Sequence, residues 1–257
     1  MMLDRILSDA RIRSREAADR SAALVEAAKR SGPATGFASA LAKPGLSVIA
    51  EVKRRSPSRG VLAAGLDAVD QAKIYADAGA SAVSVLTEPL YFDGSLDDLV
   101  AVHDAVDIPV LRKDFMLEPA QVFEARAAGA DAVLLIVAAL GSDLLGQMLG
   151  AAAEARVDAL VEVHDLSEAV VARAAGATVI GVNNRDLHSF STDLGVAEEL
   201  ASTVQGDGIT TVAESGIHTP DDASRMKDAG YDAILVGEAL VVADNPAALL
   251  SDLAGRQ

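Results

Sequence analysis

The segment Ala78–Val83 reads Ala-Gly-Ala-Ser-Ala-Val, and its Ala-Gly-x-x-apolar-apolar pattern recurs three more times along the chain. The glycines of the four copies, Gly79, Gly129, Gly176 and Gly230, are 50, 47 and 54 residues apart. Each glycine follows an alanine-rich stretch typical of a helix and precedes an apolar run typical of a buried strand. Glycine suits the residue after a helix because it adopts the left-handed backbone conformation without a Cβ clash. Each copy therefore predicts a helix, a turn and a strand.

The interval between copies is about twice the length of one strand–helix unit, so a second strand is expected between them. Apolar runs occupy these positions, at Ser47–Val52, Pro109–Arg112, Asp158–Val163 and Thr210–Ala213. Together with the strands of the repeat, they give eight predicted strands, which begin near residues 47, 81, 109, 131, 158, 178, 210 and 232. Predicted helices separate them, among which are Asp67–Ala78, Pro119–Ala128, Ser142–Arg156, Leu166–Ala175 and Pro220–Ala229.

Strands that alternate with helices form parallel sheets joined by right-handed crossovers. Eight such units in about 210 residues match a closed (β/α)8 TIM barrel, which is an α/β fold. A doubly wound open sheet is the alternative, but no Gly-x-Gly-x-x-Gly motif follows a strand. We therefore expect a single barrel domain over residues 1–257, with the barrel at 46–257 and an N-terminal helical extension and linker at 1–45. Within the extension, a helix rich in Arg and Glu should precede a linker from Ser31 to Gly45.

Composition excludes several classes of function. The 257 residues contain 22 Lys and Arg against 38 Asp and Glu, a formal charge of −16, and no cysteine. So acidic a chain is a poor nucleic-acid binder, because Lys and Arg must replace the counterions of phosphates. Without cysteine there is no disulfide, thiolate metal site or thiol nucleophile.

The first thirty residues contain no apolar stretch of signal-peptide length, and no segment is long enough to span a membrane. Their arginines would also suit a transit peptide, but five acidic residues among them argue against that alternative. We therefore expect a cytoplasmic protein with no membrane partner.

Charged residues gather where the predicted strands end, and in a barrel of this type those ends carry the chemistry. Glu51 and Lys53 are two residues apart, so on a strand they face the same side as Ile49, which we expect to be the barrel interior. Lys113 and Glu162 end two other strands. Lysines and carboxylates at one rim are typical of a general acid–base site, in which burial and neighbours tune each pKa. An inert ion pair is the alternative for Glu51 and Lys53.

The last two predicted strands end in small residues. Ser215-Gly216 and Gly237 would expose backbone N–H groups beside helix N-termini, where anions bind well. The loops after the seventh and eighth strands are the usual phosphate site of such barrels, and Ser56 adds a hydroxyl after the first strand. We therefore expect a small phosphorylated ligand, with ordinary tight turns as the alternative explanation.

Aromatic residues make up 3% of the chain, yet Tyr91, Phe92 and Phe115 fall in two loops after predicted strands. This clustering favours a flat apolar substrate, with core packing as the alternative. The histidines lack the spacing of metal ligands, so we expect no metal site; they are His103, His164, His188 and His218. For His164, two residues after Glu162, we expect a supporting role rather than catalysis.

Taken together, these motifs resemble the signature segments of the indole-3-glycerol phosphate synthase family. They occur in family order, in register from about residue 46 to residue 245. The matching segments are Ile49–Gly60 (IAEVKRRSPSRG), Ser84–Glu88, Tyr91–Ser95, Pro109–Phe115, Leu160–His164, Ile180–Leu187 and Val212–Ile217. The linker between Arg30 and Ser47 is shorter than the family pattern, so the resemblance does not imply how the extension covers the barrel mouth.

The resemblance implies a carboxy-lyase of tryptophan biosynthesis. Its reaction converts 1-(2-carboxyphenylamino)-1-deoxyribulose 5-phosphate to indole-3-glycerol phosphate, CO₂ and water, with no cofactor. By the same resemblance, Lys113 is the general acid on the C2′ carbonyl and Glu162 stabilises the cationic ring intermediate. Lys53, oriented by Glu51, assists the dehydration, and Asn183 places Glu51 and the substrate hydroxyls; which lysine serves which step stays open. The residues implied to bind substrate or phosphate are Ser56, Phe92, Phe115, Arg185, Glu214, Ser215, Gly216, Gly237 and Glu238.

Two other functions fit part of the pattern. Phosphoribosylanthranilate isomerase is one, but resemblance to that enzyme usually involves a catalytic Cys/Asp pair, and this chain has no cysteine. A non-catalytic barrel that binds phosphorylated metabolites is the other. The joint presence of the five implied catalytic residues argues against it. Association with other enzymes of the pathway and the oligomeric state stay undecided by the sequence.

Overall fold

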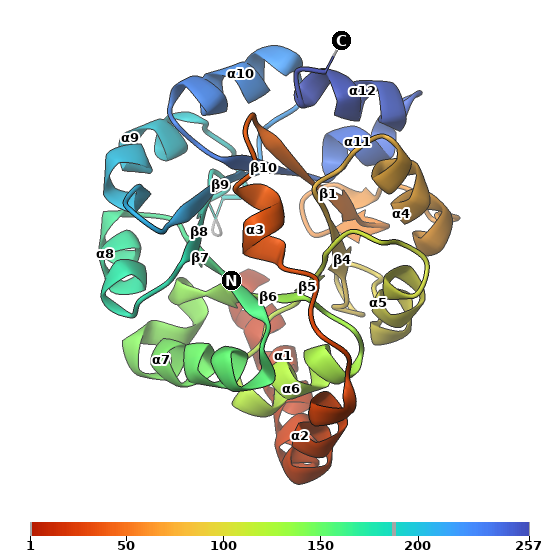
Figure 1. Cartoon of the computed structure of the whole chain (residues 1–257), viewed down its shortest axis with the longest axis vertical. Coiled ribbons are helices and arrows are strands. Elements are labelled where there is room, and N and C mark those ends of the chain that lie inside the picture. The colour runs from red at the N-terminus through yellow and green to blue at the C-terminus, as the bar shows by residue number, and fades with distance from the viewer. Residues whose placement is uncertain (1, 187–188, 257) are drawn as a thin grey trace.

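The computed structural model describes residues 2–186 and 189–256. Within them, eight parallel strands close into a barrel in the order β1-β10-β9-β8-β7-β6-β5-β4. These strands are β1 (Ser47–Val52), β4 (Ala82–Leu86), β5 (Val110–Lys113), β6 (Ala132–Ile136), β7 (Asp158–Val163), β8 (Val179–Asn183), β9 (Thr210–Glu214) and β10 (Ala233–Val236). Figure 1 shows the ring of strands with helices around it. The predicted (β/α)8 barrel is confirmed, and the alternative of an open sheet is wrong.

The helices of the barrel lie outside the strands (Figure 1). They are α4 (Ala68–Asp77), α5 (Leu96–His103), α6 (Pro119–Ala127), α7 (Val137–Ala155), α8 (Leu166–Ala174), α9 (Gly195–Val204), α10 (Pro220–Asp228), α11 (Glu238–Val242) and α12 (Pro246–Leu253). Side-chain caps fix where several begin, because a cap satisfies N–H groups that the first turn leaves free. Asp67 accepts from two N–H groups of α4, and Thr219 forms a capping box with Asp222 on α10.

The glycines of the repeat occupy the backbone conformation that the sequence predicts for them. Their φ angles are 89°, 95°, 82° and 90° at Gly79, Gly129, Gly176 and Gly230. Each ends a helix and turns the chain toward the next strand. Helix α7 differs from its predicted range, since it begins at Val137 and is interrupted at Gly141. Its first turn continues the apolar run of β6, so composition alone could not separate the strand from the helix.

The N-terminal extension contains three helices, α1 (Met2–Asp19), α2 (Ser21–Arg30) and α3 (Phe37–Leu41). The segment from Ser31 to Gly45, which we expected to be a linker, therefore contains a short helix, α3. Phe37 and Leu41 of α3 are fully buried. They pack against the side chains that fill the barrel interior. In Figure 1, α3 lies across the centre of the ring of strands.

Helix α3 closes the barrel at the amino ends of the strands. The backbone N–H of Ala38 donates to Asp158, the first residue of β7, at 2.8 Å, and Ser47 at the start of β1 donates to Leu41 O at 2.9 Å. A second layer of apolar residues packs between the outside of the strands and the surrounding helices. Along β1, Ile49 faces the interior and its neighbours face the helices, as predicted. The other end of the barrel, where the carboxyl ends of the strands lie, is therefore the one that can hold a site.

Helix α1 is attached at the open end of the barrel, where the carboxyl ends of the strands lie. Arg13 lies 3.2 Å from Glu88 and 3.1 Å from Asp114, in the loops after β4 and β5. The hydroxyl of Tyr91 donates to Asp9 at 2.8 Å. These contacts show how the extension reaches the barrel mouth, which the sequence did not imply. Across the described part of the chain, no helix is long and apolar enough to cross a membrane.

Candidate active site

One cavity opens at the carboxyl ends of the strands and collects the predicted site residues. All of them except Glu214 line it: Glu51, Lys53, Ser56, Phe92, Lys113, Phe115, Glu162, Asn183, Arg185, Ser215, Gly216, Gly237 and Glu238. Glu214 lies beneath the cavity floor and is 1% exposed. These residues belong to seven strands and the loops after them, and Leu134 and Ile136 of β6 also line the cavity. They meet in one place because parallel strands present their carboxyl ends on the same side.

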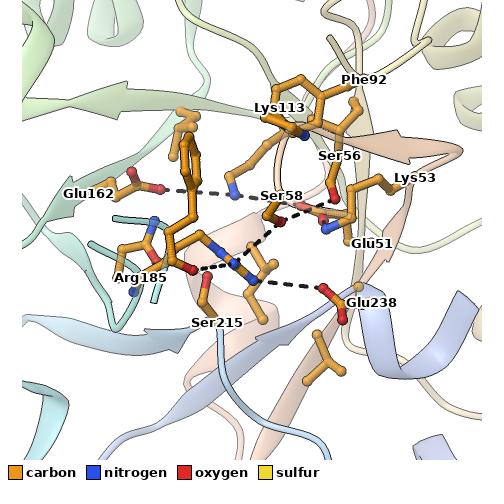
Figure 2. A pocket seen from close by; sticks show the side chains of 18 of the residues that line it. Glu51, Lys53, Ser56, Ser58, Phe92, Lys113, Glu162, Arg185, Ser215 and Glu238 are labelled. Atoms are coloured by element: carbon orange, nitrogen blue, oxygen red, sulfur yellow. Dashed lines mark hydrogen bonds and ion pairs between the residues drawn. The ribbon is translucent and has the colours of Figure 1, made fainter. Parts of the chain in front are cut away.

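Lys113 is surrounded by carboxylates. Its Nζ lies 3.2 Å from Glu214 Oε2, 3.5 Å from Glu51 Oε2 and 3.9 Å from Glu162 Oε2. The second lysine, Lys53, lies 2.6 Å from the other oxygen of Glu51. Figure 2 shows both ammonium groups pointing toward the centre of the site. Glu51 and Lys53 thus share one face, as predicted, and form part of a larger cluster instead of an isolated pair.

Two glycines make room for this cluster. A Cβ at Gly181, in β8, would collide with Glu214 Oε1, and one at Gly237 would collide with Glu51 Oε1. Gly237 had been assigned only to phosphate binding, and Gly181 to no role at all. At both positions, a residue larger than glycine would fill the space that the neighbouring buried carboxyl group occupies.

Burial and charge act in opposite directions on these groups. Burial alone would lower the pKa of Lys113, but attraction to Glu214, Glu51 and Glu162 outweighs it and raises that pKa above its usual range. Burial would raise the pKa of Glu51, but attraction to Lys53 and Lys113 outweighs it and lowers that pKa. Lys113 therefore faces carboxylates that favour its ammonium form.

The two remaining carboxyl groups have pKa values that move apart. Burial raises the pKa of Glu214 to about 8, and repulsion from Glu162 and Glu51 adds to the rise while Lys113 opposes it. For Glu162, burial would raise the pKa, but contact with His164 and attraction to Lys113 outweigh it and lower the pKa to about 2. Paired groups with separated pKa values can serve as acid and base at the same pH. At neutral pH, Glu162 is ionised and Glu214 holds a proton.

A second part of the cavity is suited to an anion. Ser215 and Gly216 follow β9 in the left-handed conformation, with φ angles of 65° and 80°. Ser56 begins the turn that joins the short strands β2 (Arg55–Ser56) and β3 (Gly60–Val61), and its hydroxyl accepts from the N–H of Arg59 at 3.2 Å. Arg185 reaches the hydroxyl of Ser58 at 3.5 Å. Hydroxyl groups, turn N–H groups and a guanidinium therefore surround one side of the cavity.

Glu238 is held between two arginines. Its Oε1 lies 2.9 Å from Arg59 Nε, and its Oε2 lies 3.8 Å from Arg185 Nη2. Figure 2 shows the contact of Arg185 with Glu238 and with Ser58. The carboxylate thus orients cations at the rim of the cavity. Arg59 has no assigned role in the sequence interpretation, because its partner is 179 positions away along the chain.

Another part of the cavity is apolar. The rings of Phe92 and Phe115 lie with centroids 6.2 Å apart, at 37° to each other. Leu3 and Ile6 of helix α1 line the same cavity, although the sequence interpretation assigned them no role. Tyr91 is not part of this surface, because its hydroxyl binds Asp9 of α1. Two of the three clustered aromatics therefore face the site.

Asn183 and His164 both support Glu162. Asn183 contacts Glu162 and its Oδ1 accepts from the backbone N–H of Arg185 at 3.0 Å. The hydrogen bonds among the described residues include none between Asn183 and Glu51, the partner expected from the resemblance. His188 and Leu187 lie outside the described residues. Among those described, no group of three or more His, Asp or Glu residues could hold a metal ion.

The sequence profile of the indole-3-glycerol phosphate synthase family matches residues 3–253. The chain belongs to this family. Curated indole-3-glycerol phosphate synthases align with nearly its whole length. The protein of Mycolicibacterium smegmatis is 47% identical over 254 residues, which cover 98% of this chain and 93% of the relative. That of Parafrankia sp. is 48% identical over 252 residues, with the same coverage.

Solved structures of lower identity share the fold. A 3-hexulose-6-phosphate synthase superposes with a TM-score of 0.66 at 17% identity, covering 82% of this chain and 99% of that one. A thiamine phosphate pyrophosphorylase from Pyrococcus furiosus gives a TM-score of 0.60 at 19% identity, covering 81% of this chain and 93% of that one. Membership of the indole-3-glycerol phosphate synthase family therefore rests on the sequence matches, and these two structures support only the barrel.

Proposed function

We propose that this protein catalyses the reaction of its family, the conversion of 1-(2-carboxyphenylamino)-1-deoxyribulose 5-phosphate to indole-3-glycerol phosphate with release of CO₂ and water. The observation that carries the proposal is the position of Lys113, whose ammonium lies within 4.0 Å of three buried carboxylates. Removing such charges from water is costly, and a protein that only holds a ligand has no need of them. A site that moves protons does need them.

The substrate has three parts, and the cavity offers a region for each. Its phosphate would meet the hydroxyl and turn N–H groups of Ser56, Ser215 and Gly216, with Gly237 close by and Arg185 as the cation. Its aromatic ring would pack between Phe92 and Phe115 and against the residues of α1. In this arrangement the ketone carbon lies between the phosphate and the aromatic ring of the substrate, next to Lys113.

The first step forms a carbon–carbon bond. The ring carbon that bears the carboxylate attacks the C2′ carbonyl carbon, and Lys113 donates a proton to the carbonyl oxygen as it becomes a hydroxyl. The ring then carries a positive charge. The carboxylate of Glu162 faces this charge and stabilises it, because it is ionised and its field acts in a largely buried site.

The later steps restore the aromatic system. The bond to the carboxylate breaks, CO₂ leaves, and its electron pair neutralises the cation of the ring. Lys53, held by Glu51, then donates a proton to the C2′ hydroxyl, which departs as water while C1′ loses a proton to solvent. Glu214 holds a proton at neutral pH and contacts Lys113, so it can return one to the lysine between turnovers. The substrate carboxylate is ionised, so the balance is one substrate and one proton to one indole, one CO₂ and one water.

The experiment that tests this function uses the full chain and the carboxyphenylamino substrate. Indole fluorescence should rise on mixing, and CO₂ should form in equal amount without any added metal or cofactor. Substrate that binds without either product would instead indicate the non-catalytic barrel. Because the pathway acts on phosphorylated metabolites, we infer that the protein works in the cytoplasm.

A further inference from the structure

His164 lies directly behind a carboxylate of the active site. It follows β7 at once, and its ring stands between Glu162 and Glu168, which is in the first turn of α8. Nε2 of the ring lies 3.3 Å from Glu162 Oε1, and Nδ1 lies 3.0 Å from Glu168 Oε2. The backbone N–H of His164 donates to that same oxygen of Glu168 at 2.8 Å. Contacts on both sides therefore fix the direction of the ring.

The two oxygens of Glu162 face different groups. Oε1 is directed at His164, and Oε2 faces Lys113 at 3.9 Å. A carboxylate held through one oxygen cannot rotate freely about its last bond, so the other oxygen keeps its direction toward the cavity. Figure 2 shows Glu162 pointing toward the ammonium of Lys113.

The charge of His164 depends on the two carboxyl groups that its ring contacts. Nε2 faces Glu162 and Nδ1 faces Glu168. Burial alone would lower the pKa of His164, but contact with Glu162 and Glu168 outweighs it and raises that pKa to about 10. The ring is therefore an imidazolium at neutral pH and places a positive charge beside Glu162.

We propose that His164 is a positioning residue for the reaction proposed above, on which this inference rests: clamped by Glu168, its imidazolium keeps Glu162 anionic and directs Oε2 at the cationic intermediate. The histidine itself does not touch substrate. Its effect passes through Glu162, and Glu168 acts one step further out by orienting and charging the ring. Removing the histidine leaves an ionised group in a buried site with one partner fewer, which favours protonation of Glu162.

Other charged groups face His164 and Glu162, and the test must distinguish their titration from that of these two residues. They are Glu168 and Asp165 at the start of α8, Lys113 on β5, Glu214 on β9 and Glu51 on β1. Glu214 changes protonation near pH 8, and Lys113 stays charged well above neutrality. The limb near pH 8 therefore does not report on Glu162. The acid limb includes both Glu162 and Glu51, whose pKa values are lowered, but only Glu162 contacts His164, so a shift of that limb on changing His164 reports on Glu162.

The experiment compares His164→Asn and Glu168→Gln with His103→Asn, a matched exchange at the last residue of α5. We expect kcat of His164→Asn to fall about tenfold to a hundredfold, as for the loss of one contact between charged groups, with a much smaller change in KM. Its acid limb should move to higher pH. Glu168→Gln should show the same shift to a smaller extent, and His103→Asn should match the wild type. An unchanged acid limb and kcat in His164→Asn would overturn the proposal.

A second measurement does not depend on activity, and its deciding result comes from the wild-type chain. Ring ¹⁵N chemical shifts of histidine in the intact wild-type chain report the charge of His164, which we expect to remain an imidazolium at pH 8, whereas in Glu168→Gln it should lose its proton at lower pH. A neutral ring at pH 7 in the wild type would contradict the inference. If the wild type forms no indole, the proposed function fails, while this titration still decides the state of His164.

Discussion

The ammonium nitrogen of Lys113, at the end of β5, lies 3.2 Å from Oε2 of Glu214, at the end of β9. The two groups complement each other, because burial disfavours charge on both and each favours the charged form of the other. The remaining carboxylates raise the pKa of the lysine and also that of Glu214. In the resting enzyme this arrangement places a charged ammonium beside a carboxyl group whose pKa is raised to about 8, and the first prediction concerns that carboxyl group.

Glu214→Gln should imitate the protonated form of the carboxyl group. Because the pKa of Glu214 is raised to about 8, the wild type should show a change in kcat/KM near pH 8 that the variant lacks. The raised pKa also means that the folded state binds the proton more tightly than the unfolded chain. Stability from this group is therefore present at low pH and lost as pH rises from the unfolded value through about 8.

The variant should thus gain thermal stability relative to the wild type as pH increases from 6 to 8.5. Glu198→Gln is the control, since the pKa of Glu198 is lowered by its contact with Arg225 on the surface. A Tm difference for Glu214→Gln that stays constant across this range would show that the carboxyl group is ionised throughout.

Arg13→Ala should detach helix α1 from the mouth of the barrel. The substitution leaves Glu88 and Asp114 buried with one cation fewer, and because Arg13 is partly exposed we expect a loss of about 1–3 kcal/mol in unfolding free energy. Leu3 and Ile6 line the cavity from this helix, so KM should rise. Urea unfolding and steady-state kinetics measure the two effects. Arg15→Ala, at an exposed position of the same helix, should change neither.

Gly181→Ala should disturb the carboxylates from beneath. Its new methyl group would meet Glu214 Oε1 and Leu160 Cδ1, and such overpacking costs about 1–3 kcal/mol. We expect lower stability together with lower kcat, measured by thermal unfolding and by indole formation. Gly150→Ala is the matched control, because Gly150 is an exposed position of helix α7 and nothing lies within 4 Å of its added Cβ. An active, fully stable Gly181→Ala would contradict the packing described.

Inorganic phosphate should compete with the substrate. The anion would take the place of the substrate phosphate beside Ser215, Gly216 and Arg185, so apparent KM should rise with phosphate concentration while kcat stays constant. Initial rates at several phosphate concentrations, at constant ionic strength with chloride, make the comparison. Rates that respond equally to both salts would argue against an anion pocket.

The sequence predicts the barrel and much of its site because both depend on local patterns. Alternation along one strand places Glu51 on the inside with Ile49, and the parallel arrangement brings Lys113 and Glu162 to the same end. Chain order alone does not reveal contacts between distant elements. No local pattern in the sequence indicates that Phe37 closes the barrel or that Leu3 lines the cavity.

The supporting partners of the charged residues are also missed, for the same reason. Glu168 and Arg59 look like ordinary charged residues of a helix start and a hairpin. Only the fold shows that Glu168 holds His164, and that Arg59 meets Glu238 across the mouth of the barrel. Residues that act through another residue leave no pattern in the chain unless they lie close to it in the sequence, as His164 does two residues after Glu162.

The central claim is that Lys113 delivers the proton for ring closure. The measurement that tests it most directly is product formation by Lys113→Ala, followed by indole fluorescence, together with substrate binding by calorimetry. We expect turnover to fall by at least about 100-fold, the contribution typical of a general acid, while the substrate still binds through its phosphate. A Lys113→Ala enzyme that forms indole-3-glycerol phosphate at close to the wild-type rate would contradict the account.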